Sequence, residues 1–158
     1  MDAPRFIADQ NVGKLARWLR MLGFDTVFFN GQDESEMVRL ALDKSRVILT
    51  RNTRIMKRRF VTSGQLKAVL LASDRPEEQI CQIIKSLGLK NNFRPFTLCI
   101  EDNHALEKRS EEDVKDRVPP YVFNTQQEFV ECSHCHRVYW RGTHWQAMTS
   151  KLEKLAGC

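Results

Sequence analysis

The chain has 158 residues, of which 28% are charged and 42% hydrophobic, with a net charge of +5 and a pI of about 9.1. This composition is typical of a globular protein with one domain, or with one domain and a small appendage. No apolar run is long enough to cross a bilayer, and the first residues, "MDAPRF", form no basic-then-apolar leader, so we expect no membrane association and a cytoplasmic location. The positive charge favours polyanions such as nucleic acid, although an ordinary basic protein would show it too.

Short apolar runs alternate with helical periodicity through the first 90 residues. Strands are predicted for "RFIA", "TVFF", "RVILT" and "KAVLLAS", at residues 5–8, 26–29, 46–50 and 67–73. Helices are predicted over residues 12–23, 33–45, 53–60 and 75–89. This alternation predicts an α/β fold with a mostly parallel sheet, whose continuous apolar strands are covered on both faces.

The sequence changes character after residue 91. Helical periodicity fades, and the segment "LEKRSEEDVKDRVPP" is highly charged and ends in two prolines. We therefore expect residues 1–91 to form the α/β domain and residues 92–158 to form a small irregular module. A helix over "HWQAMTSKLEKLAG" is predicted to finish the chain.

Three predicted strands are followed closely by an Asp or Asn, namely Asp9, Asn52 and Asp74. Parallel strands bring their carboxyl ends to one edge, where open α/β sheets bind ligands, and Asp33 and Glu34 could reach that edge. Clustered carboxylates repel one another unless a cation lies among them. Mg²⁺ or Mn²⁺ would suit such oxygen ligands and could activate water against a phosphodiester. The alternative is that Asp9 and Asp74 are loop residues or helix caps.

Basic residues gather in "RNTRIMKRR", directly after the third predicted strand. On one continuous helix, three of its arginines would share a side and could contact phosphate groups. The alternative is an ordinary solvated helix face. The candidate RNA-binding residues, including two from the first predicted helix, are Lys14, Arg17, Arg51, Arg54 and Arg58.

A second candidate site lies in the C-terminal part of the chain. Cys132 and Cys135 form a C-x-x-C pair, and Cys99 and Asp102 form a C-x-x-D pair upstream. In a cytosolic chain this spacing indicates metal or redox chemistry before structural disulfides. Zinc accepts carboxylate as well as thiolate ligands, so these four residues could bind Zn²⁺ and stabilise a module with few core residues.

Two alternatives to this ligand set remain. One of three histidines could replace a ligand: His104, His134 or His136. Otherwise no metal binds, and the module packs on the α/β domain through three aromatic residues: Tyr139, Trp140 and Trp145.

Several segments together resemble the Mut-seven C-terminal RNase domain family. They are "GKLARWLRMLGFDT", an acidic residue opening the next helix, "VILTRN", "PEEQI" and "CSHCHRVYWRGTHWQAM". The resemblance covers almost the whole chain. It implies a PIN-like three-layer α/β/α fold with a zinc ribbon toward the C-terminus, and metal-dependent ribonuclease activity.

The resemblance also implies roles for residues by position. Asp9 and Asp33 match the first two acidic residues of the family, but Asn52 stands where the family pattern "LTRD" has its third. Asn keeps one oxygen and removes a negative charge, which would weaken metal binding; Asp74 is a candidate to replace that charge. In the zinc site, three cysteines match and Asp102 stands where a fourth cysteine is usual.

Three hypotheses follow. The first is a Mg²⁺- or Mn²⁺-dependent ribonuclease that uses Asp9, Asp33, Asn52 and Asp74. The second is an RNA-binding module whose nuclease centre is weakened or inactive because of Asn52. The third is an interaction domain, or the toxin of a toxin–antitoxin pair, as among PIN-like proteins. A toxin should be lethal when it is expressed alone.

Overall fold

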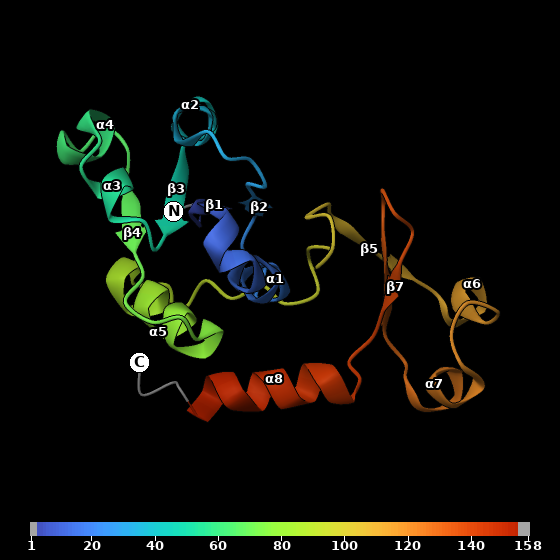
Figure 1. Cartoon of the computed structure of the whole chain (residues 1–158). Helices are drawn as coiled ribbons and strands as arrows, with labels where there is room; N and C mark the ends of the chain where they lie inside the picture. The colour runs from blue at the N-terminus through green and yellow to red at the C-terminus, as the bar shows by residue number, and fades with distance from the viewer. Residues whose placement is uncertain (1–2, 155–158) are drawn as a thin grey trace.

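The structure, a computed structural model, describes residues 3–154 and contains a parallel and an antiparallel sheet with surrounding helices (Figure 1). The parallel sheet has the order β2-β1-β3-β4. Its strands are β1 (Arg5–Ala8), β2 (Thr26–Phe28), β3 (Arg46–Thr50) and β4 (Ala68–Leu70). The predicted parallel strands are therefore confirmed, although β4 is shorter than the apolar run that indicated it.

Helices cover both faces of this sheet. Helices α1 (Gly13–Met21) and α5 (Pro76–Leu87) pack on one face with the side chains of Phe6 and Leu49. The opposite face carries intervening strand residues, such as Ile48, against the helices α2 (Glu34–Lys44) and α3 (Thr53–Met56). Because successive strand residues point to opposite faces, the continuous apolar runs fill both cores, and the chain is a mixed α/β protein.

The predicted helix over residues 53–60 is wrong in one respect. It is divided into α3 and α4 (Arg59–Thr62), because Arg58 adopts an extended backbone with φ −62° and ψ 141°. Ile55 is fully buried, and Val61 packs against the same core. Six residues apart on one straight helix, these side chains would face different directions, so the break allows both to reach the sheet.

The C-terminal part is more regular than the sequence indicates. Its antiparallel sheet has the order β5-β6-β7, formed by β5 (Leu106–Arg109), β6 (Phe129–Cys132) and β7 (Val138–Tyr139). Two short helices, α6 (Glu111–Val114) and α7 (Pro120–Thr125), connect β5 to β6. Its buried apolar cluster has three members: Val114, Val118 and Phe129. So small a core leaves this part of the chain dependent on other interactions.

Helix α8 (Thr143–Lys154) follows β7 and runs back beneath α5 (Figure 1). Lys151 Nζ lies 3.9 Å from Glu77 Oε1 of α5. The predicted C-terminal helix extended to residue 157, and its last three residues lie outside the described residues. Within residues 3–154, the structure has no helix that is both long and apolar enough to span a membrane.

The segment after α5 fits closely over the end of α1. The Arg94 amide donates to the Leu22 carbonyl at 2.8 Å, beside Gly23, whose φ is +92°. A Cβ atom at Gly23 would lie 2.1 Å from the Arg94 carbonyl oxygen. Glycine is required here by both the left-handed backbone and the close approach.

Arg20 joins the parallel sheet to the loop that precedes β5. Its side chain is buried; Nε donates to the Thr26 carbonyl at 2.8 Å, and Nη1 donates to the carbonyls of Ile100 and Glu101 at 2.8 and 3.2 Å. Burial lowers the pKa of Arg20, against the raising influence of Cys99, Asp102 and Glu101. One guanidinium therefore fixes the loop that carries two of the candidate metal ligands.

Replacing Arg20 with leucine should lower the free energy of unfolding by about 2–4 kcal/mol, because three partly buried carbonyl groups lose their donor. Urea denaturation followed by circular dichroism would measure this. The control is Arg17→Gln on the same helix, which removes only the exposed ion pair with Glu101 and should cost less than about 1 kcal/mol. Equal effects of the two variants would contradict the role given to Arg20.

Candidate functional site

Asp9 lies at the carboxyl end of β1 and is only 8% exposed. Its Oδ1 accepts from the Gln10 amide at 2.7 Å and caps a 3-10 turn, Gln10–Val12. Its Oδ2 accepts from the Thr50 hydroxyl at 2.7 Å, at the end of the neighbouring β3. A carboxylate has about four lone-pair sites, so Asp9 is held firmly and still has acceptor capacity toward the sheet edge.

Asn52 follows β3 and occupies the N-cap of α3. Its Oδ1 accepts from the Arg54 amide at 3.0 Å, and its Nδ2 donates to Glu34 Oε1 at 2.6 Å. Glu34 also forms ion pairs with Arg54 at 2.9 Å and Arg58 at 3.3 Å. Desolvation would raise the pKa of Glu34, but the hydrogen bonds from Asn52 and Arg58 and the two charges outweigh it and lower that pKa.

The capping bond sets which end of the Asn52 amide faces the site. Because Oδ1 accepts from the Arg54 amide, the NH₂ group is turned toward Glu34. Reversing the amide would place two donors against each other at the helix end. An aspartate could cap with one oxygen and present the other to the site. Asn52 therefore offers a donor where a metal would require an acceptor.

Asp9, Glu34 and Asn52 line one cavity of about 110 Å³, which Arg54 also borders. The other two predicted acidic residues lie outside its lining. Asp33 is exposed and caps α2 by accepting from the Ser35 amide at 2.9 Å, and Asp74 is exposed beyond β4. The structure thus brings together Asp9 and Asn52 with Glu34, the neighbour of Asp33.

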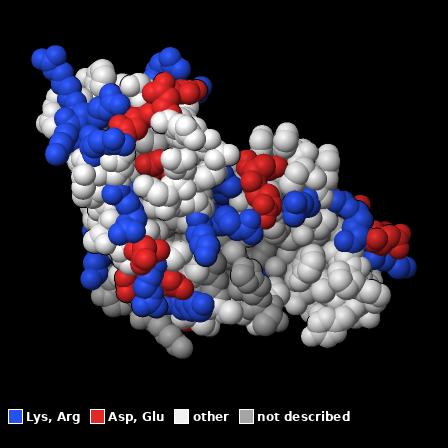
Figure 2. Space-filling model, viewed as in Figure 1, with Lys and Arg blue, Asp and Glu red and all other residues white. Residues whose placement is uncertain are grey.

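The predicted RNA-binding residues fall into two groups. Lys14 and Arg17 are exposed on α1, one turn apart. Arg51 is exposed at the end of β3, while Arg54 and Arg58 contact Glu34. Figure 2 shows Lys and Arg side chains gathered at the upper left, over α3 and α4, with acidic side chains beside them. The basic surface therefore adjoins the acidic cavity.

The second candidate site is formed by two similar turns. In the first, the Cys99 amide donates to the His104 carbonyl at 2.8 Å and the Asn103 amide to the Cys99 carbonyl at 2.9 Å. In the second, the Cys132 amide donates to the Arg137 carbonyl at 2.9 Å and the His136 amide to the Cys132 carbonyl at 3.1 Å. Asn103 and His136, the fifth residues of the turns, have φ values of +67° and +62°, a conformation in which Asn and His are enriched.

Each turn places its first and fourth residues on one side. The candidate ligand atoms of Cys99, Asp102, Cys132 and Cys135 lie within 4.8 Å of one another. Cys99 Sγ is 3.7 Å from Cys135 Sγ, and Cys132 Sγ is 3.3 Å from Asp102 Oδ1. Cys132 Sγ also accepts from the backbone amides of His134 and Cys135, each at 3.4 Å. The four side chains form a group that could hold a metal ion.

The electrostatics of this group suit a cation. The pKa of the Cys135 thiol is raised to about 12, mainly by desolvation and also by contacts with Cys132, Cys99 and Asp102, against the lowering effect of the Arg137 amide. Desolvation also raises the pKa of Asp102, but donors from His104, Cys132 and His134 outweigh it and lower the pKa overall. Thiolates so close together would repel one another without a positive ion.

Two of the predicted substitute ligands lie beside this group. His134 Nδ1 is 3.1 Å from Asp102 Oδ2, and the rings of His104 and His134 stack with centroids 4.2 Å apart. Asp102, His104 and His134 form a second group whose ligand atoms could meet at one ion. His136 instead places Nδ1 3.1 Å from Glu131 Oε2, away from the four-residue group.

Thr50 and Tyr139 are neighbours of these sites that the sequence did not identify. Thr50 is fully buried; its hydroxyl donates to Asp9 and accepts from the Asn52 amide at 2.9 Å. The Tyr139 hydroxyl lies 3.0 Å from Cys99 Sγ. The one signal for Thr50 was a hydroxyl residue within an otherwise apolar strand, two positions before Asn52.

Comparison with protein families finds that residues 4–152 match the Mut7-C RNAse domain. No curated protein and no solved structure matches the chain. The match covers nearly the whole chain, and a family of RNase domains indicates a ribonuclease-type function with RNA as substrate or partner. The chain belongs to the Mut7-C RNAse domain family.

Proposed function

We propose that this protein is a metal-dependent ribonuclease of the PIN-like type, with its reaction centre at the carboxyl ends of β1 and β3. The observation that supports this most directly is the shared cavity of Asp9, Glu34 and Asn52, next to Arg54. In this proposal residues 1–91 contain the nuclease centre, and residues 92–158 form a zinc-ribbon-like module.

The residues at the sheet edge fit Mg²⁺ or Mn²⁺ as a partial ligand set. Asp9 and Glu34 supply two carboxylates, and Mg²⁺ often uses one or two carboxylates together with substrate phosphates and water. When bound, such an ion would lower the pKa of a water molecule and stabilise charge on the phosphate. Because Asn52 presents an NH₂ group, we expect weak metal binding before RNA arrives.

The chain's own residues would position the RNA. The Arg54 side chain is 76% exposed and pairs with Glu34 at 2.9 Å, and an exposed ion pair is weak enough for its guanidinium to turn toward a phosphate. Arg58, Lys14 and Arg17 would add further backbone contacts. Contacts of this kind hold the strand in place without reading its sequence, and they predict binding that weakens steeply with added salt.

The four residues of the second site fit zinc. Three thiol sulfurs and one carboxylate lie within 4.8 Å of one another, and amide donors to Cys132 Sγ would support a thiolate. The proposed role is structural. Cys99, Asp102, Cys132 and Cys135 would join the two turns, and Arg20 would join the first turn to α1.

A second candidate function is RNA binding without cleavage. It is favoured by one specific observation, that Asn52 and two arginines already satisfy Glu34. In that case the basic surface would bind RNA with the same salt dependence, and added metal would have no effect on the RNA.

Cleavage of a labelled single-stranded RNA in Mn²⁺ tests the proposal. We expect wild type to cut, and Glu34→Gln to cut at least about tenfold more slowly, because losing a group that orients the ligands of a metal commonly costs about 10- to 100-fold in activity. The matched control is Asp33→Asn, which removes the adjacent charge and keeps a good helix cap; it should cut at the wild-type rate.

The other outcomes of this experiment are also informative. If Asp33→Asn abolishes cleavage and Glu34→Gln does not, the second acidic residue of the centre is Asp33. If RNA is bound and no variant or wild type cuts it at any metal concentration, RNA binding without cleavage replaces the proposed function.

A further inference from the structure

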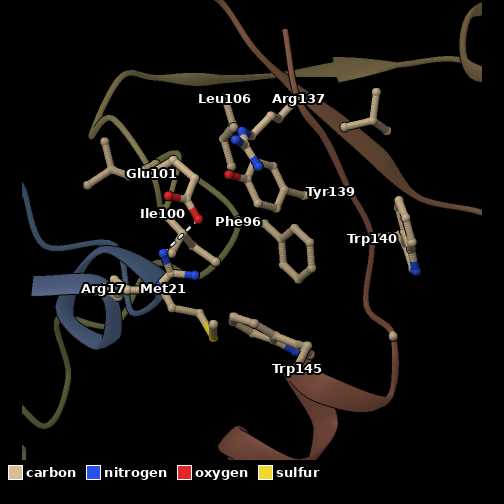
Figure 3. Close-up of a pocket in the computed structure, with 13 residues that line it drawn as sticks. Arg17, Met21, Phe96, Ile100, Glu101, Leu106, Arg137, Tyr139, Trp140 and Trp145 are labelled. Carbon is tan, nitrogen blue, oxygen red and sulfur yellow. Dashed lines mark hydrogen bonds and ion pairs between the residues drawn. The ribbon is translucent and has the colours of Figure 1, made fainter. Parts of the chain in front are cut away.

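A second cavity, of about 330 Å³, lies where α1, residues 96–101, β7 and the start of α8 meet. It is separate from the acidic cavity and shares no lining residue with it. Four aromatic side chains contribute to its walls: Phe96, Tyr139, Trp140 and Trp145 (Figure 3). Its volume is at the lower end of ligand pockets, which suits one small flat group better than a long chain.

Phe96 is held in this cavity in an unusual backbone conformation. Its φ is +63°, a left-handed value that is strained and an outlier for a bulky residue. Its ring lies 4.6 Å from that of Trp145, centroid to centroid, and the Arg141 guanidinium lies 5.2 Å from the ring centre. Backbone strain of this kind is concentrated at ligand-binding and active sites, so it supports a binding role for this aromatic ring.

Charged groups surround the aromatic walls. Arg17 and Arg137 line the cavity, and Arg17 is paired with Glu101 at 2.6 Å (Figure 3). Arginine planes and aromatic faces are the groups on which proteins stack unpaired bases, while the arginine charge attracts the phosphates on either side.

Helix α1 connects this cavity to the acidic edge, the carboxyl ends of β1 and β3 beside which Asp9 and Glu34 line the smaller cavity. It begins directly after the 3-10 turn that Asp9 caps, and its later residues Arg17 and Met21 line the aromatic cavity. Lys14 is exposed between the two, one turn before Arg17. At about 1.5 Å rise per residue, the nine-residue helix spans roughly 13 Å, a separation that one strand of a few nucleotides can bridge.

We propose that the aromatic cavity binds an unstacked nucleobase of single-stranded RNA. Lys14 and Arg17 contact the adjoining phosphates, between this cavity and the acidic edge. The ligand class rests on the proposed function, because it takes RNA to be the molecule that the acidic edge acts on. The aromatic faces accept any base, so this site would add affinity for single strands and little sequence preference.

Calorimetric titration of the full chain with AMP and with ribose 5-phosphate isolates the contribution of the base. The two probes share the sugar and the phosphate and differ only in the base. We expect AMP to bind roughly 5- to 100-fold more tightly, as stacking of one base on aromatic side chains predicts. Equal binding of the two probes would overturn the proposal.

Phe96→Gly is the informative variant, because glycine adopts the φ of +63° without strain. It should keep a melting temperature near that of wild type and lose about tenfold in affinity for AMP. Trp145→Leu should lose a similar factor. The matched control is Tyr121→Leu, which removes a 76% exposed aromatic residue on α7, outside the cavity lining, and should bind AMP as wild type does.

Two measurements separate failure of this site from failure of the proposed function. If wild type cleaves single-stranded RNA in Mn²⁺ while AMP and ribose 5-phosphate bind equally, the nucleobase site is wrong and the nuclease stands. If AMP binds and depends on Phe96 but RNA is never cut, the nucleobase site stands on an RNA-binding protein. Unchanged AMP affinity in both Phe96→Gly and Trp145→Leu would reject the cavity as the binding site.

Discussion

Replacing Cys132 with serine should abolish binding of the proposed zinc ion and unfold the antiparallel part of the chain. Cys132 is fully buried, and its sulfur has two amide donors and the Asp102 carboxylate around it. Zinc-finger peptides gain roughly 10–16 kcal/mol from their ion. The loss of that amount would exceed the roughly 4.5–9 kcal/mol that burial of three apolar side chains contributes to a small module.

The same change should leave the parallel sheet folded. Its two cores, one on each face, contain sixteen and eight buried residues and include none of the four candidate ligands. Thermal unfolding followed by circular dichroism should therefore show a new transition at lower temperature, with the main transition retained. Zinc content by atomic absorption should fall from one ion per chain to none, and a strong chelator should reproduce both effects in wild type.

Asp102→Cys is a control variant that should strengthen zinc binding instead of weakening it. It restores a fourth thiolate at the position where the first turn already presents its side chain to the other ligands, so zinc should become harder to remove with chelator. If wild-type protein contains no zinc, and its unfolding is the same with and without chelator, the metal has no structural role. The module would then be stabilised by its small apolar cluster and by its contacts with α1 and β2, which include the hydrogen bonds of Arg20 and Asn103.

The sequence predicted the acidic edge because the relevant information is local. Asp9 and Asn52 follow neighbouring parallel strands, whose carboxyl ends must meet, and both line the acidic cavity. Asp74 follows β4 and lies outside that lining. The choice between Asp33 and Glu34 could not be made in this way. The side chains of adjacent residues at a helix start differ by about 100° in direction. Asp33 accepts the capping hydrogen bond from the Ser35 amide, which leaves Glu34 to face the cavity.

The aromatic cavity could not be predicted from the sequence, for a different reason. Its walls come from residues nearly 130 positions apart, from Arg17 to Trp145, and nothing local indicates that they meet. The sequence indicates Tyr139, Trp140 and Trp145 only as packing residues of the module, and it gives no sign that Phe96 has a positive φ. The walls of the cavity meet because the chain after β7 leads into α8, which places Trp145 beside Phe96.

Asn52 links local structure to chemistry most directly. Asn52 lies two residues after the end of β3 and caps α3, and an amide can satisfy this requirement with its one oxygen. The remaining NH₂ group then donates to Glu34, which replaces part of the positive charge that a metal would supply. An amide at this position therefore keeps the cap of α3 and presents a donor toward the cavity.

Asn52→Asp should strengthen binding of Mn²⁺ by about 1–3 kcal/mol, or roughly 5- to 150-fold. The aspartate could still cap α3, and its second oxygen would face Glu34 and Asp9 as a third carboxylate. Without metal, the variant should be less stable by about 1–2 kcal/mol, since a 2.6 Å hydrogen bond to Glu34 is replaced by repulsion. The melting temperature should therefore rise more on addition of Mn²⁺ than it does for wild type, and RNA cleavage should accelerate.

The double variant Asp9→Asn with Asn52→Asp tests whether the gain comes from this site. Asp9 is held at the same edge by Gln10 and Thr50, and asparagine there keeps an acceptor while removing the charge. The extra stabilisation by Mn²⁺ and the faster cleavage should both disappear. If Asn52→Asp gains neither metal affinity nor activity, the NH₂ group of Asn52 is not what limits this centre. If it gains activity from a wild type that has none, the natural protein binds RNA without cutting it.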